Sequence, residues 1–514
     1  MYGRKASVRD LEYPFFFGNK KKGEERREGE RMLELIHKAV WGPWLMVLFL
    51  GVGTLYTVRS GFFQLRGLKV WWQATAGSFG KTGKEQVKTA CTALAATVGT
   101  GNITGVATAV AAGGPGALFW MWVSAAAGMM TAYGEVYLGI QSRYALSEGG
   151  IACGPYVYLE RMAGQRGLSL VYAFLCVVGS LGMGSMVQAN SLAETVSYSF
   201  GIPAAAAAAF LCLAAGLVIG GGRKRIGEAA AGLIPFSAGL YMAFSIAVLI
   251  LCREQLPDAV RSVFREAFTL PAALGGAAGS GISGAVRYGL ARGVFSNEAG
   301  LGSMAILHGD SPGQDARLQG MWAMFEVFFD TIVVCTLTGL VILCCGGGGE
   351  PAPEGAALAS WCFQKHLGNA GGYAVSLSMI LFAFATIIAW YYLGSQALLF
   401  LIGRLGWKNG KNAAALYRFL YLGAVCMGCV AAMEKVWLFS DIVNGLLSLP
   451  NLLALVLLVR RVEFPGRFPA DSPPARGETK KRPAKDAGES FFRISENGVF
   501  WIAVFLGAVQ LLFL

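Results

Sequence analysis

Long apolar stretches recur along the chain from about residue 41 to the C-terminus, separated by short polar segments. Most are close to the roughly 20 residues that a helix needs to cross a bilayer. They do not alternate apolar and polar residues as the strands of a membrane barrel do. The pattern predicts an all-α polytopic membrane protein with eleven spans, near 41–58, 90–112, 116–141, 168–199, 203–221, 229–252, 286–306, 318–345, 373–403, 413–433 and 437–459.

The same pattern divides the chain into six segments. The first span is followed by a basic amphipathic connector in which Trp71 and Trp72 lie among lysines, a composition typical of an interfacial helix. The last apolar run is short, and is either a twelfth span or an interfacial C-terminal helix. We expect a polar N-terminal segment (1–40), an extra N-terminal transmembrane helix (41–60), the connector (61–89), a ten-helix core (90–459), a basic Pro-rich tail (460–498) and a hydrophobic C-terminal segment (499–514).

Composition agrees with a membrane protein. Of the 514 residues, 55% are hydrophobic and 14% are charged, whereas soluble proteins carry about 25% charged residues. The net charge of +12 falls largely in short loops and tails, where basic residues act as topology signals. The charge therefore does not indicate nucleic-acid binding.

Loop charge also predicts an orientation, because cytoplasmic loops carry an excess of Lys and Arg. The segment 346–372 lacks this excess and is predicted outside. With eleven spans, parity then places the N-terminus outside, although the basic residues of 1–40 oppose that orientation. We expect a multi-pass protein of the plasma membrane, such as the bacterial inner membrane. The inner side is predicted from the basic segments 59–89, 223–225, 403–411 and 460–493.

Residues with reactive side chains are too few or too scattered for an enzyme. The chain has three histidines and eleven cysteines, the latter mostly single and within apolar runs. Cys426 and Cys429 form one C-x-x-C pair on an apolar helix, where small packing residues are the ordinary interpretation. We find no nucleophile elbow, cofactor loop or nucleotide-binding domain, and we predict neither an enzyme nor an organic cofactor.

Two apolar spans contain clustered glycine and polar residues. The first reads V-G-T-G-N-I-T-G at 98–105, and the second reads R-Y-G-L-A-R-G-V-F-S-N-E-A-G-L-G-S at 287–303. Non-helical backbone survives at membrane depth only when it is buried in protein or lines a cavity. The freed N–H groups of a half-helix suit a carboxylate, and freed carbonyls suit a cation. The first break lacks the G-K-[ST] ending of a phosphate loop, while close helix packing is the alternative use of such glycines.

The two breaks lie five spans apart, in the first and sixth helices of a ten-helix unit. Gly-interrupted segments at matching positions of two halves indicate an inverted-repeat transporter with a binding site at the bilayer midplane. No internal sequence identity marks the repeat, so this prediction depends on the positions of the two breaks in the order of the spans.

Several segments closely resemble the signatures of the alanine/glycine:cation symporter family, the sodium:alanine symporters. The resemblance covers about residues 35–460. It implies a LeuT-type inverted-repeat bundle of ten helices with one extra N-terminal helix, and sodium-coupled uptake of alanine or glycine by alternating access. The matching segments are 92–125, 184–191, 224–227, 287–303, 330–336, 382–392 and 443–452.

The resemblance implies roles for residues at both breaks, with a small zwitterion as substrate. Its carboxylate would meet backbone N–H groups around Thr100, Gly101 and Asn102. Its ammonium would meet carbonyls near Phe295, Ser296 and Asn297. Gln188, on the third core helix, would hydrogen-bond either end of the substrate, although helix–helix hydrogen bonding is the alternative role for this side chain.

The resemblance also implies a sodium site. Carbonyl oxygens of Ala95 and Val98 would contribute from the first break, and Phe382 and Thr386 from the eighth core helix. The family usually has Ser-Thr where this chain has Ala385 and Thr386. One hydroxyl group is therefore missing, which opens the alternative of proton coupling.

Carboxylates inside membrane spans are functional candidates by default. Five residues qualify: Glu135, Glu194, Glu298, Glu326 and Asp330. Among them Glu298 and Asp330 are the gating or coupling candidates, with Arg292, or Arg287, as the expected ion-pair partner. Structural pairing and direct cation coupling both remain open for these acids. The alternatives to a sodium symporter are a proton-coupled carrier of the same fold and an uncoupled amino-acid channel or sensor.

Overall fold

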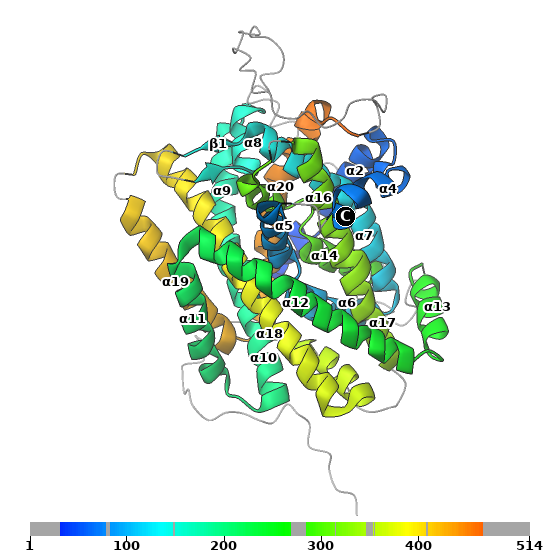
Figure 1. Ribbon diagram of the computed structural model, residues 1–514. Coiled ribbons are helices and arrows are strands. Elements are labelled where there is room, and N and C mark those ends of the chain that lie inside the picture. The colour runs from blue at the N-terminus through cyan, green and yellow to red at the C-terminus, as the bar shows by residue number, and fades with distance from the viewer. Residues whose placement is uncertain are drawn as a thin grey trace, which may run out of the picture.

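The computed structural model describes residues 31–78, 83–146, 150–268, 284–313, 315–345, 353, 355–407 and 410–465. The hydrophobic segment predicted at 499–514, nearly all of the basic tail and residues 1–30 lie outside this range. The described chain is almost entirely helical (Figure 1). Its two short strands, β1 (Tyr144–Ala145) and β2 (Ile151–Ala152), form one antiparallel pair.

Helices occupy all eleven predicted span positions. Among the described residues, seven helices are long and apolar enough to cross a membrane, and a bent helix pair makes an eighth. This confirms a polytopic all-α membrane protein. The helices are α2 (Pro43–Arg59), α5 (Lys84–Thr97), α6 (Thr104–Gly113), α7 (Gly116–Ser142), α9 (Arg166–Leu181), α10 (Gln188–Phe200), α11 (Ala204–Gly220), α12 (Gly222–Leu251), α14 (Gly284–Asn297), α15 (Ser303–Leu307), α16 (Ala316–Val327), α17 (Thr336–Cys345), α18 (Gly355–Leu405), α19 (Gly410–Val430) and α20 (Met433–Leu458).

Shorter helices connect these spans. α3 (Phe63–Arg66) and α4 (Leu68–Ala74) lie in the stretch predicted as an amphipathic connector, and α5 already begins within that stretch. Trp71 is fully buried and its indole stacks edge-on to Phe328. The connector is therefore packed onto the bundle through this side chain. Two further short helices are α8 (Pro155–Arg161) and α13 (Leu256–Glu266), and residues 31–40, predicted as part of the polar N-terminal segment, are also helical.

Two long spans contain a π-helical segment at mid-length. Gly182–Val187 joins α9 to α10, and Phe328–Cys335 joins α16 to α17. An extra residue per turn rotates the side chains that follow, and such bulges are frequent at functional sites. Gln188 follows the first segment directly, and Asp330 lies within the second.

Small residues let the central helices approach closely, as is usual between membrane helices. A Cβ atom placed on Gly128 of α7 would lie 2.9 Å from Cβ of Ala299, and one on Gly293 of α14 would lie 2.8 Å from Cβ of Ser124. The backbone around residues 293–299 is thus held directly against α7.

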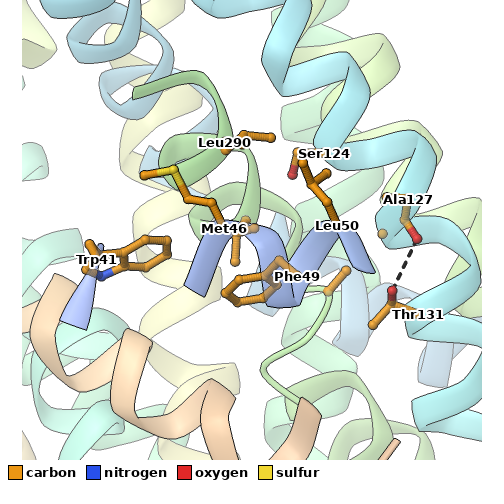
Figure 2. A pocket seen from close by; sticks show the side chains of 11 residues that line it. Trp41, Met46, Phe49, Leu50, Ser124, Ala127, Thr131 and Leu290 are labelled. Atoms are coloured by element: carbon orange, nitrogen blue, oxygen red, sulfur yellow. Dashed lines mark hydrogen bonds between the residues drawn. The ribbon is translucent and has the colours of Figure 1, made fainter. Parts of the chain in front are cut away.

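The N-terminal helix α2 packs against α7 and α20. Tyr56 donates its hydroxyl to the carbonyl of Leu455 at 2.9 Å, and its ring fills the space beside Gly134. A cavity of about 20 Å³ remains between α2, α7 and α14, lined by Met46 and Phe49 of α2, Ser124 and Thr131 of α7 and Leu290 of α14 (Figure 2). The extra helix is thus part of the same packed bundle.

We predict that Gly134→Ala destabilises the protein, because the new Cβ would lie 2.2 Å from the Tyr56 ring. Overpacking of this kind costs about 1–3 kcal/mol, so the midpoint of thermal unfolding should fall by several degrees. Gly51→Ala on α2 is the matched control, since nothing lies within 4 Å of its Cβ position. Equal stability of the two variants would contradict this packing.

Candidate functional site

The first predicted break is present. α5 ends at Thr97 and α6 begins at Thr104, and the two helices are bent by 56°. Val98 and Gly99 leave helical geometry, with ψ angles of 89° and −153°, before a 3₁₀ turn over Thr100–Asn102. The N–H of Gly99 donates to Asn102 Oδ1 at 2.9 Å. A side chain thereby replaces the helical acceptor that the break removes.

The second predicted break is also present. α14 ends at Asn297 and α15 begins at Ser303. Between them Glu298, Gly300 and Gly302 have φ angles of 55°, 92° and 80°. A left-handed non-glycine residue costs about 1–3 kcal/mol and persists only where its surroundings hold it.

Glu298 is held by neutral donors. Ser303 Oγ donates to its Oε2 at 2.5 Å, and Trp390 Nε1 of α18 donates to its Oε1 at 3.0 Å. The residue as a whole is 2% exposed. These two contacts fix the side chain of the strained residue.

The two breaks meet at Asp330. Asn102 Nδ2, from the first break, donates to Asp330 Oδ1 at 2.6 Å, and Ser296 Oγ, from the second, donates to Oδ2 at 2.8 Å. A Cβ atom on Gly101 would lie 3.2 Å from Cδ1 of Phe295. The predicted residues of the first break thus adjoin Phe295 and Ser296. Asn297 points elsewhere, to Thr331 Oγ1 at 3.3 Å.

Gln188 contacts the first break directly. Its Oε1 accepts hydrogen bonds from the N–H of Thr100 at 3.0 Å and from Thr100 Oγ1 at 2.9 Å. An amide oxygen therefore occupies the position where a carboxylate oxygen would meet the freed N–H group. This arrangement fits an anion-binding half-helix end whose acceptor is supplied by the protein.

The residues predicted for a cation are buried around the same break, and a Cβ atom on Gly99 would meet both Thr386 Oγ1 and Gln188 Oε1. Ala95, Val98 and Phe382 are fully buried, and Thr386 is 1% exposed. Thr386 Oγ1 would lie 2.6 Å from a Cβ atom on Gly99 and has no hydrogen-bond partner among the described residues. Leaving such an oxygen unpaired costs about 1–3 kcal/mol, so the hydroxyl group suits a cation at this position.

Comparison with known proteins agrees with this geometry. The chain matches the family model of the sodium:alanine symporter family over residues 26–464.

The chain belongs to the sodium:alanine symporter family.

Its relatives are transporters of nearly the same length. It is 40% identical to an uncharacterized transporter of Haemophilus influenzae over 431 residues, which cover 83% of this chain and 93% of the relative. It is 36% identical to the sodium/alanine symporter AgcS of Methanococcus maripaludis, over 83% of this chain and 94% of AgcS. It is 32% identical to the probable sodium/glutamine symporter GlnT of Bacillus subtilis, over 84% of this chain and 89% of GlnT.

One predicted contact of this family member is wrong. Arg292 does not pair with Glu298 or Asp330. It forms a bidentate ion pair with Asp441 of α20, at 2.8 and 3.0 Å. Arg292 lies more than one turn before the second break, so its side chain reaches α20 rather than the break. His37 Nε2 lies 3.6 Å from the same Asp441 carboxylate.

An aromatic layer lies beside this ion pair. The rings of Phe295 and Trp437 are 4.8 Å apart, and the Arg292 guanidinium lies 4.5 Å from the Trp437 ring centroid. Together with the ion pair, these rings cover the breaks on the side where α14 begins. We call this set, Arg292, Phe295, Trp437 and Asp441, the ring-and-ion-pair layer.

The opposite side holds a cavity of about 320 Å³ between α5, α12 and α18. Lys88, Arg223 and Lys224 line it, so we call this end of the bundle the basic side. Asp310 accepts from Arg223 Nη1 at 2.7 Å and from the Tyr392 hydroxyl at 2.5 Å across the cavity. The site is thus covered by the ring-and-ion-pair layer on one side and approached by a polar cavity on the other.

Sequence reasoning missed several partners of the breaks. Glu135 accepts from the N–H of Gly300 at 2.8 Å and from Asn451 Nδ2 at 2.6 Å, and neither contact follows from the position of this acid within a span. Trp390 and Asp441 are not among the predicted site residues. No local signal marks these contacts, because each joins segments that are far apart in the sequence.

We predict that Arg292→Leu and Asp441→Leu each lower the midpoint of thermal unfolding more than the double variant does. Removing one partner leaves a buried charge, which costs about 3–5 kcal/mol, whereas removing both does not. A double variant that is no more stable than either single variant would contradict the pairing.

Proposed function

We propose that the chain is a secondary active symporter that couples sodium influx to the uptake of a small neutral amino acid, alanine or glycine, by alternating access. Family membership supports amino-acid and cation symport in general. The observation that carries the specific proposal is the meeting of the two breaks at Asp330, because it brings opposing half-helix ends to one buried place.

The proposal includes a LeuT-type arrangement, with two inverted repeats of five helices behind the extra helix α2. The breaks fall in the first and sixth of the ten remaining spans, where such repeats would put them. We place the basic side in the cytoplasm because of its lysines and arginines. The N-terminus would then lie outside a plasma membrane.

We propose that the substrate carboxylate takes the place of Gln188 Oε1 on the N–H of Thr100. Its ammonium would face carbonyls near Phe295 and Ser296. The near contact of Gly101 with the Phe295 ring favours a substrate with a small side chain. The name of GlnT refers to glutamine, so the family name alone does not decide the amino acid.

For sodium we propose the carbonyl oxygens of Ala95, Val98 and Phe382 together with Thr386 Oγ1. The unpaired, buried hydroxyl of Thr386 supports this assignment. Ala385 supplies no hydroxyl group, so a carbonyl or a water would complete the shell. Charged carboxylates are not required in such a site because carbonyl and hydroxyl oxygens are hard ligands.

Proton coupling is the second candidate, favoured by one observation. Among the described residues, the hydrogen bonds to the carboxyl groups of Asp330 and Glu298 come from neutral donors. A fully buried carboxylate without a cation is costly, and either a proton or a metal cation relieves that cost. Asp330 would be the coupling residue because it contacts both breaks.

The test is uptake of labelled alanine into proteoliposomes with an inward sodium gradient, an inward proton gradient or neither. Accumulation only with the sodium gradient is expected. Accumulation with the proton gradient alone would favour the second candidate. Equilibration without accumulation in every condition would overturn symport in favour of a channel.

We predict that Thr386→Val raises the sodium concentration for half-maximal uptake at least about tenfold, since a lost ligand bond of about 1.4 kcal/mol has that effect. Thr338→Val in α17 is the matched control, because its hydroxyl bonds to Tyr241 and not to either break. Unchanged sodium dependence in Thr386→Val would remove this residue from the site.

We predict that Gly101→Leu reduces alanine uptake to background without loss of folded protein. The new side chain would occupy the space against Phe295 in which the substrate is placed. Gly105→Ala is the control, since its nearest neighbour is Arg292 Cδ at 4.0 Å. Near-normal uptake by Gly101→Leu would contradict the substrate assignment.

A further inference from the structure

A chain of buried polar side chains connects α5 to α16 on the basic side, apart from the proposed substrate and sodium residues. Gln86 of α5 and Gln319 of α16 exchange two amide hydrogen bonds, at 3.1 and 2.7 Å. Gln319 Oε1 also lies 2.9 Å from His308 Nδ1. His308 Nε2 lies 3.2 Å from both carboxylate oxygens of Glu326. His308, Gln319 and Glu326 are fully buried.

The hydrogen-bond pattern fixes where protons lie in this chain. Gln319 Nε2 donates to Gln86, so the oxygen of the same amide faces His308. His308 Nδ1 must therefore carry a hydrogen. Its Nε2 then faces the Glu326 carboxyl, and two bare acceptors at this distance would repel each other. One proton must lie between His308 Nε2 and Glu326, on either partner.

No neighbouring charge substitutes for that proton among the residues that the structure describes. From α5 the thiol of Cys91 is the titratable group near Glu326. Asp310, two residues after His308, is engaged by Arg223 and Tyr392. From the end of α7, the Arg143 guanidinium is directed to the carbonyls of Gly309 and Ser311. Among these neighbours, therefore, no cation neutralises the Glu326 carboxylate, and the proton shared with His308 does so instead.

The position of this pair matters because α5 ends at the first break. The backbone leaves helical geometry at 98–103, so α5 can pivot there relative to α6. Gln86 lies in the first turn of α5, at the far end from that pivot, beside the cavity of the basic side. Contacts of Gln86 with α16 therefore oppose movement of α5 away from the bundle.

We propose that His308 and Glu326 form a proton-binding site whose proton stabilises the contact between α5 and α16. With the proton bound, the chain from Glu326 to Gln86 has a donor facing an acceptor at every step. Loss of the proton leaves the His308 imidazole a single N–H for two acceptors, the ionised Glu326 carboxylate and Gln319 Oε1, so the chain loses one hydrogen bond. Deprotonation then favours opening of the basic side. This goes beyond sodium symport, because the ligand is a proton and the site lies outside the two breaks.

The test uses a cysteine at Thr92, which lines the basic-side cavity, and its rate of reaction with a polar maleimide. It compares the otherwise wild-type full chain with Glu326→Gln, both carrying Thr92→Cys, in lipid nanodiscs without sodium or alanine. The glutamine amide donates to His308 Nε2 at every pH, so it keeps the chain intact. Comparison at equal pH cancels the pH dependence of the thiol, and the parent without Thr92→Cys gives the background of native cysteines.

We expect equal rates near pH 6, and a rate at least about fivefold higher in the wild-type background near pH 9, a coupling of ordinary size. A rate ratio that does not change with pH would overturn the proposal, as would fast labelling of Glu326→Gln throughout. Because neither sodium nor alanine is present, this outcome is independent of the uptake experiment.

A second variant keeps the test decisive if Glu326→Gln does not fold. Gln86→Leu leaves the His308–Glu326 pair intact but removes the contact with α5. With Gln86→Leu, the cysteine at position 92 should react fast at every pH. The rate in the wild-type background should approach that fast rate only as the pH rises. Labelling of Gln86→Leu that is as slow as wild type near pH 6 would show that this contact does not restrain α5.

Discussion

Unwound backbone in a membrane interior must find its hydrogen bonds within the protein, since the hydrocarbon offers none. This constraint accounts for the polar residues around the two breaks. Asn102 and Gln188 accept from the freed N–H groups of Gly99 and Thr100. Glu135 accepts from the freed N–H of Gly300. Each unwound segment exists because a neighbouring side chain replaces a helical partner.

The two breaks satisfy this constraint differently. The second is tied to surrounding helices, because Glu135 and Asn451 hold Gly300 while Tyr172 donates to the carbonyl of Leu301. The first depends on its own Asn102 and on Gln188, the residue directly after a π-helical segment. Fewer contacts restrain the backbone of the first break. It is therefore the better placed of the two to act as a pivot.

The sequence was sufficient to find both breaks, because polar residues clustered with glycines inside an apolar span are costly unless they serve a site. Its position as a carboxylate inside an apolar span made Asp330 a candidate, and the family resemblance implied Gln188 and Thr386. The partner of Arg292 could not be found in this way. Asp441 lies 149 residues further along the chain, and only the folded bundle brings its side chain within reach of the long Arg292 side chain. The left-handed backbone of Glu298, which turns its carboxylate toward Trp390, likewise has no sequence signal for a non-glycine residue.

The two sides of the site are covered by contacts of different kinds. The ring-and-ion-pair layer combines two closely packed, mutually tilted rings with a charged pair that does not depend on a shared proton. On the basic side, the contact of α5 with α16 passes through neutral amides and one histidine–carboxylate pair. Individual neutral hydrogen bonds contribute only about 0.5–1.5 kcal/mol each. A covering built from them opens at modest cost, whereas Arg292 and Asp441 depend on each other, since a charge left buried without its partner costs about 3–5 kcal/mol. Under the alternating access proposed above, the unliganded chain would open more readily on the basic side, and binding at the breaks would supply the energy that separates Arg292 from Asp441.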